Sequence, residues 1–447
     1  MEIDLQVIDK YIKDSREYLL TNETLYEIYN GRLKEHLEDV IYKETESENA
    51  RKTILSRMSP INILQKVVQK LSKVYLNDVR RKNKFDLDEV QEEIDAFEYN
   101  ANLQSKLQKA NEMYNLHGCV AIELLSDKTL RILPAHTFLP FSASSEDDSR
   151  MTHFIKLIDK NNYIIYDENS FVEVQGTNII EEGVHNLGMI PFIYLNKNEF
   201  MLKPFEDKDT LQMTYLLPLM LTDLNYALRF QSHSIVYGIN VDAEKLQATP
   251  DSFWSFSGSG VEGDKPEIGT IKPNVDSEKM LSTIQSQFSL WLDTKNIKTY
   301  SLSSNSSGYN LSGISKAIDN ADVSDEIELQ LEVFKQAEYK LFELYKRMNN
   351  NNIFIDSKQL NDNFEPLIIF MRKSAIIETN KEKLENIILK LDKNLTSRKR
   401  ALNELYPDYT ENEIELLLQE IDEDISEDVL KESTDASSDT NNSSFAV

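Results

Sequence analysis

A change of residue pattern near His117 divides the chain and limits the folds that it can adopt. Before it, residues 1–115 place apolar side chains three and four positions apart with few glycines or prolines, which predicts helices. After it, short β-branched and aromatic runs are separated by turn residues, a pattern typical of antiparallel strands. These runs are CVAIELL (119–125), HFIKLID (153–159), NYIIYDE (162–168), SFVEVQG (170–176) and MIPFIYL (189–195). The sequence therefore predicts an α+β protein that is predominantly helical.

The second half of the chain predicts two helices that bracket a small β insert. A helix is expected over 207–233, with Pro218 as a kink, and a second one over 275–297. Between them lie three expected strands: SIVYGIN (234–240), SFWSFSG (252–258) and EIGTIKP (267–273). A Ser- and Asn-rich segment follows and predicts an exposed loop. A long helix, a strand at 365–371 and three terminal helices complete the expected order, before a polar acidic end from residue 426 that predicts disorder.

Charge and composition exclude several functions. The formal net charge of −27 makes tight wrapping of nucleic acid improbable, because phosphate binding normally needs a basic surface. Cys119 is the only cysteine, and the six histidines show no metal-ligand spacing, so neither a disulfide framework nor a zinc site is expected. Cys119 is expected to be a small buried residue, with a reactive thiol as the alternative. No apolar run approaches the ~20 residues of a membrane span, and the amino terminus lacks the layout of a signal peptide.

Motifs for nucleotide chemistry are missing or lie in the wrong context. Residues 258–263 fit G-x-G-x-x-G, but they lead into Asp264-Lys265-Pro266 rather than into a helix, so a flexible loop is the favoured interpretation. Neither a Walker-type phosphate loop nor G-x-S-x-G occurs. We therefore expect no catalytic, cofactor-binding or metal-binding residues, and no enzyme activity.

One segment opposes the overall charge. Residues 51–84 hold ten basic side chains and a single acid, Asp78. A helix is expected to start at Ser59-Pro60 and to continue to Tyr75, which would place three lysines on one face. This segment predicts a contact with DNA or with acidic neighbours in an assembly, and a solvated helix face is the alternative. The candidate residues are Lys66, Lys70, Lys73, Arg80, Arg81 and Lys82.

The order of these elements resembles the portal protein of tailed double-stranded DNA bacteriophages. The segments that carry the resemblance are GCVAIELLSDKTLRILPAHTFLPF (118–141), HNLGMIPFIYLNKN (185–198), LSGISKAIDNADVSDEIE (311–328) and IILKLDKNLTSRKRALNELYPDYTENEIELLLQEI (387–421). The resemblance covers most of the chain and is one of architecture, since none of these residues is catalytic. It implies a portal fold whose subunits close into a ring, commonly of twelve.

The resemblance also implies a division of the chain. The expected parts are a wing (1–206), a stem helix (207–233), a clip (234–274), a second stem helix (275–297), a tunnel loop (298–312), a long wing helix with its returning strand (313–375), a short helical crown (376–425) and an acidic disordered tail (426–447). The tunnel loop and its surroundings would face DNA through Lys295, Lys298, Ser301, Ser303, Ser304, Asn305, Ser306, Tyr309 and Asn310. The clip would dock the terminase and adaptor proteins through Tyr237, Phe253, Trp254, Phe256 and Lys265.

The same resemblance implies the partners and the location. A homo-oligomeric ring at one vertex of the virion capsid would pass double-stranded DNA without reading its sequence during packaging and ejection. Its partners would be the large terminase subunit, head-completion or adaptor and tail proteins, and the major capsid and scaffolding proteins, with assembly in the host cytoplasm and no membrane. The alternatives are an acidic helical scaffold or adaptor without a channel, and a hydrolase or nucleotide-dependent enzyme, which the missing motifs disfavour.

Overall fold

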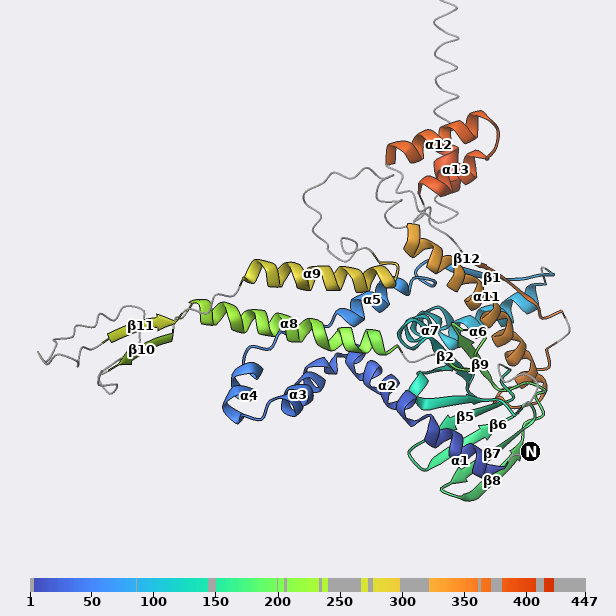
Figure 1. Cartoon of the computed structure of the whole chain (residues 1–447). Coiled ribbons are helices and arrows are strands. Elements are labelled where there is room, and N and C mark those ends of the chain that lie inside the picture. Colours follow the sequence, from blue (N-terminus) through green and yellow to red (C-terminus); the bar gives the residue numbers. More distant parts are fainter. Residues whose placement is uncertain are drawn as a thin grey trace, which may run out of the picture. The chain divides into compact units, whose positions relative to one another are not determined.

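The computed structural model is a mixed α+β protein, as the sequence pattern predicts (Figure 1). The structure describes residues 4–85, 87–143, 150–198, 200–204, 207–232, 235–239, 267–271, 276–297, 321–360, 363–370, 380–406 and 414–421. Contacts within the chain divide it into two units, residues 1–310 with 319–373 and residues 311–318 with 374–447. All strand pairs of the described residues are antiparallel.

The amino-terminal region of the first unit is helical up to His117, with one exception. Its helices are α1 (Leu5–Asp14), α2 (Arg16–Glu27), α3 (Leu33–Glu44), α4 (Glu48–Leu55), α5 (Ile63–Leu71), α6 (Asp88–Ala101) and α7 (Leu103–His117). A π-helical turn joins α2 to α3, and there Gly31 has a φ of 102°, a conformation that favours glycine. The exception is β1 (Val79–Asn83), a strand that the sequence pattern did not predict.

Helix α5 is shorter than predicted. Its N-cap is Asn62, whose side chain accepts a hydrogen bond from the Gln65 N–H, so the helix begins after Ser59-Pro60 and not with it. It ends at Leu71, because Ser72 leaves the helical conformation and lets the chain bring Tyr75 into the core. Lys73 therefore lies beyond the helix. The prediction that it shares a helical face with Lys66 and Lys70 is wrong.

The two larger sheets contain the strands predicted after His117. One has the order β3-β2-β9 and the other β4-β5-β6-β7-β8. Their bounds are β2 (Cys119–Leu124), β3 (Leu130–Leu133), β4 (Phe138–Phe141), β5 (His153–Leu157), β6 (Asn162–Tyr166), β7 (Ser170–Gln175), β8 (Asn178–Val184) and β9 (Phe192–Asn196). Strands β3, β4 and β8 were not predicted as separate elements. The edge strand β8 has exposed side chains on both faces, so its sequence shows no alternation.

Strand β2 is buried on both faces and separates two hydrophobic clusters. Val120 and Ile122 belong to the cluster that α7 and α11 (Ala321–Asn350) help to form. Cys119 and Ala121 point to the opposite side, into a cluster between α1 and the five-stranded sheet. Cys119 is thus a buried core residue, as predicted, and burial raises the pKa of its thiol to about 12.

Helix α11 contributes side chains to the first cluster and contacts elements that lie far away in the sequence. Its side chains Phe334, Leu341 and Tyr345 are fully buried, and Tyr345 stacks on Phe97 of α6 with ring centroids 4.1 Å apart. After α11 the chain returns in β12 (Pro366–Phe370), which pairs with β1. The predicted strand at 365–371 is thereby confirmed, and its partner is a strand about 290 residues earlier in the chain.

The predicted pair of helices with a β insert is present in the first unit. These helices are α8 (Lys208–Ser232) and α9 (Ser277–Thr294), and the strands between them are β10 (Ile235–Ile239) and β11 (Glu267–Ile271), which pair with each other. Helix α8 continues through Pro218 without interruption. The third expected strand, at 252–258, lies outside the described residues.

The second unit contains short helices. They are α12 (Asn380–Asp392), α13 (Arg398–Leu405) and a helical stretch at 414–421. Ile387, Ala401 and Ile414 are buried, and Lys390–Glu404 and Lys399–Glu415 ion pairs join the helices at the surface. The expected acidic tail at 426–447 lies outside the described residues.

Candidate functional site: a two-helix stem and its charged base

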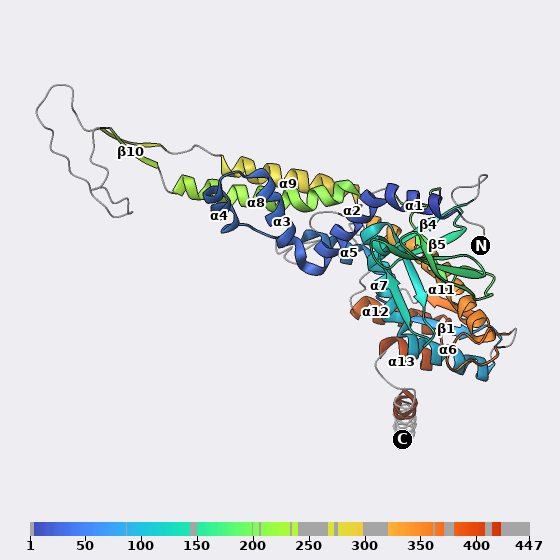
Figure 2. The same ribbon diagram turned by 90° about the horizontal axis from the view of Figure 1, so that it is seen from below.

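Helices α8 and α9 pack against each other as an antiparallel pair, which we call the stem (Figures 1 and 2). Met213 near the start of α8 shares a buried cluster with Trp291 near the end of α9. Leu224, further along α8, shares another cluster with Ile284, which lies earlier in α9. At 1.5 Å per residue, the 25 residues of α8 extend over about 37 Å.

The β10–β11 pair is attached to one end of the stem. Ser232, the last residue of α8, precedes Ile235 of β10, and Ile271 of β11 precedes α9 by a few residues. Of the predicted clip residues, Tyr237 lies in β10 opposite Gly269 of β11. The other four, Phe253, Trp254, Phe256 and Lys265, lie outside the described residues.

The opposite end of the stem, which we call the base, is joined by one carboxylate. Asp207 precedes α8 and caps it, since the Thr210 N–H donates to Asp207 Oδ1 at 3.0 Å and the Thr210 hydroxyl to Oδ2 at 2.8 Å. Lys295, directly after α9, donates from Nζ to the same Oδ2 at 2.6 Å. Burial opposes ionisation of Asp207, but the Lys295 ammonium and the Thr210 hydrogen bonds outweigh it, so the pKa of Asp207 lies below its usual range.

A second ion pair, close enough to Asp207 and Lys295 to be affected by their charges, joins the sheet to α11. Lys197, which follows β9, has its Nζ 3.7 Å from Glu326 of α11 and donates to Asn115 Oδ1 of α7 at 3.0 Å. Glu326 Oε1 also accepts from Gln330, which bonds Asn115 in turn. Three elements, β9, α7 and α11, are therefore joined through charged and amide side chains.

Residues on both sides of the 298–320 segment pack into one cluster at this base. Ile297 is fully buried in the cluster that contains Trp291 and Leu292, and Ile327 near the start of α11 packs against the same cluster. Residues 298–320 must therefore connect two points of one cluster. The predicted DNA-facing residues of this segment lie outside the described residues: Lys298, Ser301, Ser303, Ser304, Asn305, Ser306, Tyr309 and Asn310.

Lys295 differs from its expected role. The sequence interpretation treats it as a cation available to DNA beside the loop. Its ammonium is instead paired with Asp207, and only about a quarter of its side chain is exposed. The positive charge of Lys295 is therefore used to join the stem helices.

We expect the Asp207–Lys295 pair to stabilise the stem base. A double-mutant cycle with Asp207→Asn and Lys295→Met should give a coupling energy of about 1 kcal/mol in urea unfolding, a value reduced for the partial exposure of both side chains. The control is the more exposed Lys390–Glu404 pair, for which we expect about 0.5 kcal/mol or less. Equal coupling in the two cycles would contradict a special role for the base.

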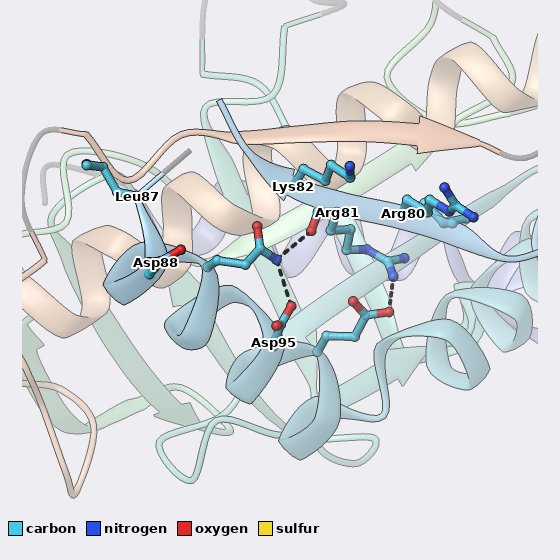
Figure 3. Close-up of a pocket in the computed structure, with 9 residues that line it drawn as sticks. Arg80, Arg81, Lys82, Leu87, Asp88 and Asp95 are labelled. Atoms are coloured by element: carbon cyan, nitrogen blue, oxygen red, sulfur yellow. Dashed lines mark hydrogen bonds and ion pairs between the residues drawn. The ribbon is translucent and has the colours of Figure 1, made fainter. Parts of the chain in front are cut away.

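The basic segment does not form one continuous surface. Figure 3 shows Arg81 directed from β1 toward α6, where it reaches Glu98. The Arg81 side chain is fully buried, and it also donates to Glu338 of α11 at 2.7 Å and 3.0 Å. Tyr75 donates its hydroxyl to the same Glu338 at 2.8 Å. The prediction that Arg81 contacts DNA or a neighbouring subunit is therefore wrong, because its charge is satisfied inside the protein.

Arg80 and Lys82, by contrast, are exposed on the other face of β1. They line a hollow of about 500 Å³ between β1 and α6 whose other wall carries Asp88 and Asp95 (Figure 3). A surface of mixed sign is a poor phosphate site, since the carboxylates repel the ligand that the cations attract. Within the described part of the chain, this hollow does not support the DNA alternative.

The outer edge of β1 is closed by a side chain of α6. Gln91 accepts from the Asn83 N–H at 2.7 Å and donates to the Arg81 carbonyl at 3.0 Å, so its amide takes the place of a further strand. The remaining candidates lie on and after α5: Lys66 is exposed, and Lys70 and Lys73 are partly buried. Burial, and then the charge of Lys73, lower the pKa of Lys70. Two separate groups of cations therefore replace the single predicted patch.

Fold and stem define the molecule as an α+β protein with a projecting helix pair. No family model matches the chain, and a search of curated proteins finds no match either. Among the described residues, no three His, Cys, Asp or Glu side chains are grouped as metal ligands. No helix within the described ranges has the length and apolar character that crossing a membrane requires.

Proposed function

We propose that the chain is the subunit of a portal-type ring, a conduit for double-stranded DNA at one vertex of a phage capsid. The observation that carries the proposal is the stem, with the β10–β11 pair at one end and both ends of the 298–320 segment at the other. A ring of such subunits would place the segment near the axis and the β pair at the docking end. The terminase and the head-completion proteins would bind there, and ATP hydrolysis by the terminase would drive the DNA.

The exposed side of α9 supports a sliding role. From Met280 to Leu292 the helix carries no charged side chain, and its exposed positions include Ser282, Gln285 and Ser286. Lysine or arginine on this side would form phosphate contacts that hold DNA in place. A hydroxyl and amide surface avoids them. The exposed side of α9 between Met280 and Leu292 is thus uncharged.

Exposed leucines on the stem support association between copies. Leu216 of α8 and Leu281 and Leu290 of α9 are exposed, and Leu290 keeps 68% of its surface accessible. Apolar side chains on a helix pair that projects from the body are covered when neighbouring stems pack side by side. A closed ring would bury them without changing the α8–α9 contact.

The ring is tested with the purified full-length chain. Native mass measurement should give one large oligomer, and electron-microscopy class averages should show a ring with an axial hole. A monomer or dimer under all conditions would instead favour the alternative of an adaptor without a channel. Turnover of ATP by the chain alone would contradict the assignment of the energy source to the terminase.

A substitution on the stem sharpens this test. Leu290→Glu should reduce the fraction of rings at least tenfold at equal concentration, because it places a charge in the contact between stems. The matched control is Leu329→Glu on α11, a leucine of similar exposure at 71%. Rings that tolerate Leu290→Glu as well as they tolerate the control would contradict stem-to-stem packing.

A further inference from the structure

Strand β8 is an edge strand with an unusual amount of exposed apolar surface. Ile179, Ile180 and Val184 are 48%, 55% and 69% exposed. Among the strands that the structure describes, it pairs with β7 alone, and the pairing contains a bulge between Glu173 and Val174. Proteins usually protect such an edge with lysine, proline or a covering element. In β8 the charged residues are acidic.

One face of β8 has an acidic residue between two apolar residues. Ile179, Glu182 and Val184 pair with Val174, Val172 and Ser170, which alternate along β7 and so share one face of the sheet. Their partners on β8 must share that face too. Glu181 pairs with Glu173 and lies on the opposite face. Among the described residues, neither Glu181 nor Glu182 forms an ion pair.

The β1–β12 pair has an outward face of the opposite charge. Arg80 is paired with Ile369 and Lys82 with Leu367, and all four side chains are exposed. The alternate residues Val79, Arg81, Asn83 and Ile368 are buried. Within the described part of the chain, Arg80 and Lys82 form no ion pair, although acids line the neighbouring hollow. The outward face is therefore a set of cations beside aliphatic side chains.

We propose that the outward face of β1–β12 binds the Ile179–Glu182–Val184 face of β8 in a second copy of this chain. The two surfaces complement each other in sign, and each has apolar side chains that the contact would cover. They belong to the same unit and lie on different sides of the body formed by α7, β9 and α11 (Figures 1 and 2). Because the two surfaces differ, the contact is head to tail, and such contacts produce rings or open filaments.

This inference rests on the proposed ring and identifies one of its subunit contacts. It differs from the stem contact, which involves α8 and α9 alone. It also gives a role to two of the predicted basic residues, Arg80 and Lys82. Arg81, between them, takes no part because its guanidinium is buried.

Charge reversal tests the contact. Glu182→Lys should weaken assembly at least tenfold in native mass measurements at low salt, and so should the double variant Arg80→Glu/Lys82→Glu. Combining these three changes should restore assembly to within about threefold of the original chain. Glu181→Lys, on the opposite face of the same strand, is the matched control and should assemble normally. Equal effects of Glu181→Lys and Glu182→Lys, or no rescue in the combined variant, would overturn the proposal.

Cross-linking gives an independent readout, because Cys119 is fully buried and adds no surface thiol. A mixture of Lys82→Cys and Glu182→Cys chains should form disulfide-linked dimers, whereas each variant alone should not. A chain with both changes should give a ladder of linked subunits. Absence of dimers in the mixture would overturn the proposal.

The outcomes separate this contact from the proposed function. Rings in the microscope without cross-links or charge dependence would reject the contact and leave the conduit intact. Cross-links in open filaments without rings would support the contact and contradict the conduit. Normal assembly of Arg80→Glu/Lys82→Glu together with loss of DNA retention would show that the basic face binds DNA, and would reject the contact.

Discussion

Replacing Arg81 by methionine is expected to lower the free energy of unfolding by about 3–5 kcal/mol, because it leaves a buried carboxylate without its cation. The side chains of Arg81 and Glu338 are both fully buried, and Glu98 lies on the second side of the guanidinium. Burial opposes the charge of Arg81, but the carboxylates outweigh it, and the pKa of Arg81 is raised above its ordinary value. Urea unfolding monitored by tryptophan fluorescence and circular dichroism measures the loss.

Two further variants separate the buried charge from the lost packing. Arg81→Met combined with Glu338→Gln should recover a large part of the stability, since the second change removes the unpaired charge. Lys52→Met removes an exposed ion pair with Glu48 and should change stability by about 0.5 kcal/mol or less. If Arg81→Met were as mild as Lys52→Met, the pair would not be the link between β1, α6 and α11 that the geometry indicates.

This link also shows where sequence reasoning reaches its limit. The residues VRRKN of β1 have neither the β-branched content nor the apolar alternation of a typical strand. The strand forms because β12 supplies a partner and because Glu338 neutralises the residue that enters the core. Both partners are more than 250 residues away in the chain. A pattern read over a short window contains neither of them.

Elements with a local signal were predicted well. Strands β5, β6 and β7 alternate or cluster apolar residues between turns, and α8 and α9 carry apolar stripes with helical spacing. The stem was therefore recognisable from sequence, including the β insert between its helices. Its base was not, because Asp207 and Lys295 are 88 positions apart and nothing in either local sequence indicates the other.

Edge strands and helix ends account for most other differences. Strand β8 faces solvent on both sides, so its residues need not alternate, and its exposed isoleucines resemble no standard pattern. Helix α5 begins three residues after the predicted proline start because Asn62 provides the cap. That shift, with the early end at Leu71, removes Lys73 from the predicted lysine face. Small errors in element boundaries thus became errors in the candidate site.

Acidification below about pH 6 is expected to destabilise the first unit through His117. This residue ends α7, where the helix dipole favours a cation by at most about 2 kcal/mol. Burial is the larger effect, with the charge of nearby His136 adding to it, and together they lower the pKa of His117 to about 3. The Asn22 amide donates to the Tyr18 carbonyl, so its oxygen accepts from His117 Nδ1 at 2.9 Å. The buried Nε2 has no described partner for a second proton.

The lowered pKa of His117 makes the folded state more stable where the imidazole is neutral. A folded-state pKa below the unfolded value of about 6.5 contributes stability that is complete above pH 6.5 and is lost as the pH falls toward 3. From pH 7 to pH 4.5 the loss from His117 should be about 2–3 kcal/mol. Carboxylates such as Asp207, whose pKa is also lowered, add losses of their own at lower pH.

The measurement is therefore a comparison of the original chain with His117→Gln in urea unfolding at several pH values. The free energy of unfolding of the variant should depend less steeply on pH. Equal profiles for the original chain and His117→Gln would contradict a neutral buried His117.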